Sequence, residues 1–274
     1  MSTTTTAPDL ETIKARQQKT WASGDYSAIA ARISLISERL CDAADLRAGW
    51  RVLDIAGGSG NTALAAARLG AEVVTLDYVP ALLDRARERA AAEGLEITTV
   101  EGDAEALPFP DASFDAVISA VGVMFAPDHA RTAAEMLRVC RPGGTVAMAN
   151  WTPDGFIGGL FSTTGAYVPP PAGVTPPPLW GTEDHVRGLL GDGVRDMRAT
   201  RRTFTFRERS PEAFVDLFRT YYGPTHMAFG ALDGDDRDGL YSALTSLVRR
   251  HDVIADDEAV ACPADYLEVI ATRV

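Results

Sequence analysis

The stretch V-L-D-I-A-G-G-S-G-N, which runs from Val52 to Asn61, decides how this chain is expected to fold. A short apolar segment leads directly into glycines, and one acid, Asp54, stands near its carboxyl end. An Ala-rich helix is predicted next, over residues 61–69. Glycines at a strand-to-helix turn let a ligand approach the backbone closely. The stretch therefore predicts a ligand-binding turn, and the acid beside it bears on which ligand is preferred.

Strands and helices alternate after this turn. Strands are predicted over residues 51–55, 72–76, 95–100, 114–120 and 145–150, with helices over 61–69, 80–94 and 131–139. Elements that alternate at this spacing form right-handed βαβ units around a parallel sheet. The sequence therefore predicts an α/β fold.

The pattern changes after Asn150. Residues 151–180 carry seven prolines and scattered aromatic residues. Such a segment is expected to be an irregular lid or packing loop, because proline interrupts both helices and central strands. Beyond it, the sequence predicts a strand over 201–208, helices over 211–222 and 235–250, and a β-rich ending over 265–273.

The glycine turn alone does not identify the ligand. Gly58, Gly60 and Ala63 satisfy G-x-G-x-x-A, the loose fingerprint of a dinucleotide site. The same glycines are also compatible with ordinary turn chemistry. The residues at the ends of the neighbouring strands therefore have to decide between ligands.

Three acids stand where the first three strands are expected to end: Asp54, Asp77 and Asp103. The carboxyl ends of parallel strands lie along one edge of a sheet, where ligands bind. Asp77 can accept hydrogen bonds from both hydroxyls of a ribose, and Asp103 can accept one from the exocyclic N–H of an adenine. A nicotinamide dinucleotide would also use Asp77, but its pyrophosphate would be repelled by Asp54. S-adenosylmethionine contains no phosphate and carries a sulfonium and an ammonium group, so it suits all three acids.

Four segments of the chain then match one family together. They are V-L-D-I-A-G-G-S-G (52–60), T-L-D-Y-V-P (75–80), E-G-D-A-E-A-L-P-F-P-D-A-S-F-D-A-V (101–117) and E-M-L-R-V-C-R-P-G-G (135–144). These segments resemble the main motifs of the class I S-adenosylmethionine-dependent methyltransferases, in particular the small-molecule branch that includes the ubiquinone and menaquinone C-methyltransferases. The resemblance covers roughly residues 45–150, with Y-L-E-V-I-A-T (266–272) as a candidate last strand. Gly57 or Gly58 replaces a residue that is often Cys in the family.

The resemblance implies a Rossmann-like, doubly wound sheet of seven strands, mostly parallel, with the last strand antiparallel. N-terminal helices and a lid insertion would complete a single methyltransferase domain over residues 1–274. Its cofactor-binding core would span 45–150, its N-terminal helical cap 10–44, and its lid and acceptor-pocket elements 151–185 and 209–255. We expect a frayed tail before about Leu10.

The resemblance also implies a cofactor-binding set. Gly58 and Gly60 would line the methionyl part, Asp77 would hold the ribose, and Asp54 would act through the ammonium group or a bridging water. Ser119, at the end of the fourth strand, would face the transferred methyl group. The whole implied set is Asp54, Ala56, Gly58, Gly60, Asp77, Tyr78, Asp103, Ala104 and Ser119.

Candidates for the methyl acceptor's pocket come from outside the core. Aromatic residues with a few polar groups suit a flat or hydrophobic small molecule, although each ring could equally pack the lid onto the core. Two histidines, His226 and His129, are candidate general bases, because histidine is the side chain that ordinarily changes charge near neutral pH. His185 and His251 stand among charged residues and are set aside. The candidate acceptor-pocket residues are Trp21, Tyr26, Trp151, Tyr167, Trp180, Tyr221 and Tyr222.

Composition narrows the possible partners. The formal net charge of −12 disfavours nucleic acid and anionic membrane surfaces. The first residues lack the features of a signal peptide and no apolar run is long enough to span a membrane, so a cytoplasmic protein is expected. The three cysteines show no metal-ligand spacing, so we expect reduced, small apolar residues and no metal. A monomer or homodimer is expected.

We therefore expect transfer of a methyl group from S-adenosylmethionine, which becomes S-adenosylhomocysteine, to an O, N or C nucleophile of a small hydrophobic or aromatic metabolite. Two alternatives stay open at this point. An NAD-dependent oxidoreductase fits the glycine fingerprint and Asp77, but not Asp54 or the adenine-side segment. A non-catalytic S-adenosylmethionine-binding protein would have intact cofactor motifs and an acceptor pocket filled by aromatic side chains.

Overall fold

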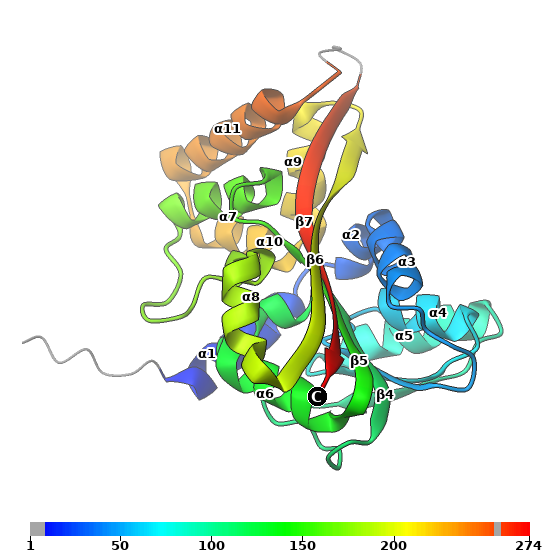
Figure 1. The fold of residues 1–274 in the computed structure, drawn as a ribbon. Helices are drawn as coiled ribbons and strands as arrows, with labels where there is room; N and C mark the ends of the chain where they lie inside the picture. The colour runs from blue at the N-terminus through cyan, green and yellow to red at the C-terminus, as the bar shows by residue number, and fades with distance from the viewer. Residues whose placement is uncertain (1–8, 255–258) are drawn as a thin grey trace, which may run out of the picture.

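A seven-stranded sheet organises the molecule (Figure 1). The computed structural model describes residues 9–254 and 259–274, so the expected frayed tail falls outside the described residues. The strands stand in the order β3-β2-β1-β4-β5-β7-β6. Neighbours from β3 to β5 pair in parallel, whereas β7 pairs antiparallel with both β5 and β6. The predicted fold class is confirmed. The strands are β1 (Arg51–Ile55), β2 (Glu72–Asp77), β3 (Ile97–Glu101), β4 (Phe114–Ala120), β5 (Cys140–Trp151), β6 (Val194–Glu208) and β7 (Val260–Arg273).

Helices cover both faces of the sheet. In Figure 1, α3, α4 and α5 lie on one side of the sheet, and α6 and α8 lie on the other. The bounds of these helices are α3 (Ser34–Ala43), α4 (Asn61–Arg68), α5 (Pro80–Ala92), α6 (His129–Val139) and α8 (Glu183–Leu190). Because both faces are covered, the central strands are apolar and buried almost throughout, as in β1 and β4.

The glycine turn packs closely against an alanine of the second crossover helix. Gly60 precedes α4 with a φ of 85°, and a Cβ at this position would lie 2.9 Å from the Cβ of Ala86 in α5. A left-handed backbone and a close helix contact both require glycine here. Gly60 therefore allows both the geometry of the turn and the close approach of α5 to it.

The N-terminal helices lie beside the carboxyl ends of the strands. They are α1 (Leu10–Trp21) and α2 (Tyr26–Arg32), and side chains of Asp9 and Asp25 accept hydrogen bonds from the first-turn N–H groups of Thr12 and Ser27. Such caps satisfy donors that the helix itself leaves unpaired. The caps fix where each helix starts.

A second group of helices packs against the upper parts of β6 and β7 (Figure 1). This group comprises α7 (Phe156–Tyr167), α9 (Pro211–Tyr221), α10 (Gly223–Ala231) and α11 (Gly234–His251). The prediction that residues 151–180 are irregular was wrong over α7. The prolines lie at residue 153 and after residue 168, which leaves a proline-free stretch whose Phe156, Ile157 and Leu160 are buried. Only the proline-rich remainder lacks a longer element; it ends in a short 3-10 helix, Pro177–Gly181.

Two further properties bear on the sequence-based expectations. No helix in the described parts of the chain has the length and apolarity needed to cross a membrane. Cys41, Cys140 and Cys262 are all buried and free. Burial raises the pKa of each thiol above its ordinary value. The cysteines therefore behave as small apolar side chains, as predicted.

Candidate functional site

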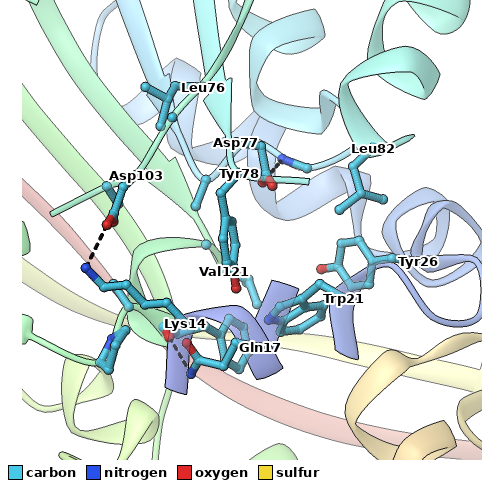
Figure 2. Close-up of a pocket in the computed structure, with 18 residues that line it drawn as sticks. Lys14, Gln17, Trp21, Tyr26, Leu76, Asp77, Tyr78, Leu82, Asp103 and Val121 are labelled. Carbon is cyan, nitrogen blue, oxygen red and sulfur yellow. Dashed lines mark hydrogen bonds and ion pairs between the residues drawn. The ribbon is translucent and has the colours of Figure 1, made fainter. Parts of the chain in front are cut away.

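A pocket opens along the carboxyl ends of β1 to β4 (Figure 2). Together with its open mouth, it takes in about 680 Å³ of empty space. Its walls come from the segments that follow these four strands and from α1 and α2. Six of the nine predicted cofactor-binding residues line it: Ala56, Gly58, Asp77, Tyr78, Asp103 and Ala104.

The carboxylate of Asp77 is held in this pocket by two backbone hydrogen bonds. Its Oδ2 accepts a hydrogen bond from the backbone N–H of Gly58, and its Oδ1 accepts one from Val79, both over 2.9 Å. Burial raises the pKa of Asp77 to about 6, although these backbone donors oppose the shift. The arrangement fixes a buried acceptor at the end of β2, beside the glycine turn.

Asp54 lies beneath the glycine turn rather than in the pocket wall. The side chain is fully buried, and its Oδ2 accepts a hydrogen bond from the N–H of Ala63 in the first turn of α4, over 3.0 Å. Burial raises the pKa of Asp54 to about 8, so the group is largely uncharged at neutral pH and serves the first turn of the helix as a hydrogen-bond acceptor. A Cβ on Gly57 would lie 2.5 Å from the same carboxylate, so that glycine is required for the fit. The predicted contact of Asp54 with an ammonium group stays a prediction.

The other two predicted cofactor residues are also structural in position. Gly60 shapes the turn, as described above, and does not line the pocket. Ser119 is buried; its hydroxyl donates to the carbonyl of Ile55 over 2.8 Å and accepts from the N–H of Val123 over 3.0 Å. Since both functions of the hydroxyl are used, Ser119 ties β1 to the turn after β4.

Helix α1 covers the pocket on the side of Asp103 (Figure 2). Lys14 forms an ion pair with Asp103 over 2.6 Å and a second one with Glu105, which is almost fully buried. Burial alone would lower the pKa of Lys14, but the two carboxylates outweigh it and raise the pKa above its ordinary value. Lys14 thus holds the N-terminal helix to the segment that follows β3.

Two amides extend this contact. Gln18 donates to the carbonyl of Tyr78 over 2.5 Å, and Gln17 donates to the carbonyl of Phe125 over 3.1 Å. Sequence reasoning missed Lys14 and Gln17 as pocket residues. Their spacing with Trp21, at i, i+3 and i+7, puts the three side chains on one helix face and was the available signal.

A second cavity adjoins this pocket. Three of the predicted acceptor-pocket residues line it, and after that prediction we call it the acceptor cavity. Together with its opening, it takes in about 310 Å³ of empty space, and it shares Tyr26 and Val121 with the first pocket. Its lining side chains are all apolar or aromatic, and the polar groups that they carry are the hydroxyls of Tyr26 and Tyr222 and the indole N–H of Trp151. The full lining is Tyr26, Ile29, Ile33, Val121, Trp151, Ile157, Leu160, Phe206, Phe218 and Tyr222.

Four of the seven predicted acceptor-pocket residues lie at these cavities. Trp21 and Tyr26 line the first pocket, and Tyr26, Trp151 and Tyr222 line the second. Trp21 meets Tyr26 and Tyr222 edge-on, with ring centroids 5.4 and 5.6 Å apart. The structure does not bring the other three there: Tyr167 packs on Gly239 of α11, Trp180 is buried beside His129, and Tyr221 is exposed.

Neither candidate base lines either cavity. His226 is exposed on α10 and contacts the carbonyl of Arg219. His129 is buried; its Nδ1 lies 2.9 Å from the Nε2 of His185, a residue that sequence reasoning had set aside. Burial, with a contribution from His185, lowers the pKa of His129 to about 4. His129 is therefore neutral at physiological pH and belongs to a buried cluster with His185 and Trp180. Among the residues that the structure describes, no group of three or more His, Cys, Asp or Glu could hold a metal ion.

Comparison with known proteins identifies relatives of this chain. A family model for a methyltransferase domain matches residues 53–148. An uncharacterised protein of Mycobacterium tuberculosis is 44% identical over 239 residues, 86% of this chain and 87% of that protein. The demethylmenaquinone methyltransferase of Thermus thermophilus is 40% identical over 142 residues, 47% of this chain and 64% of the relative.

Solved structures share the architecture. The phosphoethanolamine N-methyltransferase 2 of Haemonchus contortus, in complex with phosphomonomethylethanolamine and S-adenosylhomocysteine, superposes with a TM-score of 0.56. The match covers 86% of this chain and 52% of that chain, at 20% sequence identity. At this identity the likeness establishes a common fold.

Proposed function

The chain belongs to the class I S-adenosylmethionine-dependent methyltransferases, and from this premise we propose that it methylates an O, N or C nucleophile of a small hydrophobic or aromatic metabolite. The single observation that carries the choice of acceptor is the apolar lining of the acceptor cavity, which adjoins the pocket at the carboxyl ends of the strands. The demethylmenaquinone methyltransferases among the relatives support an acceptor of this kind, because their named substrate is a hydrophobic ring compound.

The residues of the larger pocket suit S-adenosylmethionine. Asp77 would accept hydrogen bonds from the ribose hydroxyls, because its carboxylate stands at the end of β2 and keeps lone pairs beyond its two backbone donors. Tyr78, Asp103 and Ala104 would hold the adenine, and Ala56 and Gly58 the methionyl part. The buried Oδ1 of Asp54 has no partner among the described residues, so it could receive a water that bridges to the ammonium group.

The bound cofactor supplies an activated methyl group, so the chain itself mainly has to orient the acceptor and exclude water. Helix α1 closes the cofactor side through Lys14, Gln17 and Gln18. The aromatic rings of Trp21, Tyr26 and Tyr222 close the acceptor side. These contacts support a site that is dry while the methyl group moves.

The acceptor cavity disfavours a charged acceptor. Burying an unpaired ion among apolar side chains costs far more than burying an uncharged ring. No Lys, Arg, Asp, Glu or His is among its lining residues. A phosphorylated or zwitterionic acceptor would therefore lack a counter-charge in this cavity.

The test is a methyl-transfer assay with radiolabelled S-adenosylmethionine and a panel of acceptors. We expect label in an uncharged dihydroxynaphthalene or a related ring compound, and none in phosphoethanolamine or glycine. Transfer to the charged acceptors alone would refute the proposed acceptor class. Tight binding of S-adenosylmethionine without transfer to any acceptor, over a wide panel, would favour the non-catalytic alternative.

A further inference from the structure

Tyr26 stands where three cavities meet. Besides the large pocket and the acceptor cavity, a third cavity of about 370 Å³ lies against the glycine turn and is lined by Tyr26, Gly57, Gly58, Asn61 and Val121, among others. Tyr26 and Val121 are the only residues common to all three linings. A group that passes from the cofactor side to the acceptor side has to pass these two side chains.

The ring of Tyr26 is held in place, while its hydroxyl is available. The ring packs against the glycine turn, 3.8 Å from the position of a Cβ on Gly58, and against Trp21 and Tyr222. Figure 2 shows the hydroxyl oxygen pointing into the pocket. No residue that the structure describes makes a hydrogen bond with this hydroxyl. Tyr26 therefore offers one oriented donor at the junction.

The hydroxyl stays protonated at any physiological pH. Burial, together with the charge of Asp77, raises the pKa of Tyr26 far above its ordinary value, and burial does the same for Tyr222. Tyr26 can thus donate a hydrogen bond but cannot act as a general base. Tyr222 is the other titratable side chain that lines the acceptor cavity, and its pKa is raised as well. The lining therefore offers no general base, and the acceptor's proton leaves to solvent after the transfer.

On the opposite side of the junction, Val121 has a strained backbone conformation. This β-branched residue has a φ of 54°, and its N–H donates to the carbonyl of Ala149 over 2.7 Å. Such a conformation costs on the order of 1–3 kcal/mol and persists only where the surroundings enforce it. The next residue, Gly122, packs on the backbone of Ala56, where a Cβ would come within 2.5 Å of the carbonyl oxygen. Close packing therefore surrounds Val121 as well as the ring of Tyr26.

We propose that Tyr26 is the positioning residue for the methyl acceptor. Its hydroxyl, which points into the larger pocket, donates a hydrogen bond to an oxygen that an uncharged, ring-bearing acceptor places at the junction, while the ring is seated in the acceptor cavity with Val121 as the opposite wall. In the transfer, an electron pair of the acceptor forms the bond to the methyl carbon as the sulfur–methyl bond breaks. The electrons of that bond stay on sulfur, and the acceptor's proton is released to solvent after the transfer, when the site opens. This inference rests on the proposed function and adds the residue that orients the acceptor.

The experiment compares the parent protein with Tyr26→Phe, and with Tyr241→Phe on α11 as a matched control that lies outside all three cavities. Calorimetry measures the binding of two probes to protein saturated with S-adenosylhomocysteine: a dihydroxynaphthalene, and naphthalene, which lacks the hydroxyls. We expect Tyr26→Phe to weaken the dihydroxynaphthalene by about tenfold, the effect of one lost hydrogen bond. Binding of naphthalene and of S-adenosylhomocysteine should stay within about twofold, because no hydrogen bond of theirs is removed.

The remaining outcomes overturn the inference. Equal affinity of the parent and Tyr26→Phe for the dihydroxynaphthalene, or no binding by the parent, would remove Tyr26 from the acceptor site. An equal loss of affinity for both probes would make Tyr26 a packing residue. A loss of affinity for S-adenosylhomocysteine alone would assign Tyr26 to the cofactor site. A failure of the proposed function gives a different result. Methyl transfer would then be absent, while the parent and Tyr26→Phe would still differ in their affinity for the dihydroxynaphthalene.

Discussion

The carboxylate of Asp77, at the end of β2, accepts a hydrogen bond over 2.9 Å from the backbone N–H of Gly58, in the turn after β1. Two motifs that lie 19 positions apart in the chain are thereby joined in one wall of the pocket. The same carboxylate would bind the ribose, so Asp77 both stabilises the glycine turn and would recognise the ligand. Its ionisation should therefore control affinity for the cofactor.

We expect the affinity for S-adenosylhomocysteine to fall as the pH decreases through about 6, the raised pKa of Asp77. The ionised carboxylate accepts the ribose hydrogen bonds, and protonation removes acceptor capacity, so binding is strongest above this pH. Calorimetric titrations from about pH 8 to about pH 5 measure the effect, at most a tenfold loss per pH unit. Asp77→Asn should bind weakly at every pH. A parental profile that is flat through pH 6 would contradict the assignment.

Lys14→Gln should release α1 from the pocket. The change removes the ion pairs with Asp103 and Glu105 and leaves Glu105 buried without its cation. We expect S-adenosylhomocysteine to dissociate about five- to tenfold faster, and amides of residues 10–21 to exchange hydrogen faster. Lys19→Gln, which removes an exposed lysine from the same helix, is the matched control. If both variants behave alike, the contact of Lys14 does not hold the helix.

Gly57→Ala should destabilise the protein for a steric reason. A Cβ on Gly57 would lie 2.1 Å from the hydroxyl of Thr75 and 2.5 Å from the carboxylate of Asp54, both fully buried. We expect the free energy of unfolding to drop by about 1–3 kcal/mol, as for other overpacked sites. Gly188→Ala within α8, where no atom lies within 4 Å, should instead stabilise by up to about 1 kcal/mol. Chemical denaturation of both variants tests this, and equal stabilities would refute the described packing of the turn.

Contact between the buried His129 and the half-buried His185 should make stability depend on pH. The pKa of His129 is lowered to about 4 from an unfolded value near 6.5, so the unfolded chain binds the proton more readily between these values. Neutral His129 therefore makes its full contribution to the free energy of unfolding above about pH 6.5, and this contribution is lost as the pH falls towards 4. The loss amounts to at most about 3 kcal/mol. Comparing the free energy of unfolding of the parent and His129→Gln across this range isolates it; identical slopes would show that His129 titrates normally.

Much of the core could be predicted from the sequence because local signals and tertiary structure agree there. The strand over 51–55, the glycine turn and Pro80 at the start of α5 are fixed by the residues themselves. The acids at strand ends were also informative, since parallel strands bring their carboxyl ends to one edge. Asp77 and Asp103 accordingly line one pocket.

The remaining features depended on contacts between distant parts of the chain. Trp180 and Trp151 look alike in sequence, yet only Trp151 lines the acceptor cavity, because the contact of Trp180 with the histidine pair determines its place. Lys14 was missed because its partners lie 89 and 91 residues away. Aromatic residue type alone cannot tell a pocket wall from a packing contact.

The most direct test of the central claim is calorimetric titration of the purified protein and of Asp77→Asn with S-adenosylmethionine, S-adenosylhomocysteine and NAD in parallel. The account predicts that the parent binds the first two and not NAD, and that Asp77→Asn loses about tenfold or more of that affinity. An exposed substitution on the neighbouring helix, Asp84→Asn, should leave it unchanged. Binding of NAD alone, or equal affinity of the parent and Asp77→Asn for S-adenosylmethionine, would contradict the account.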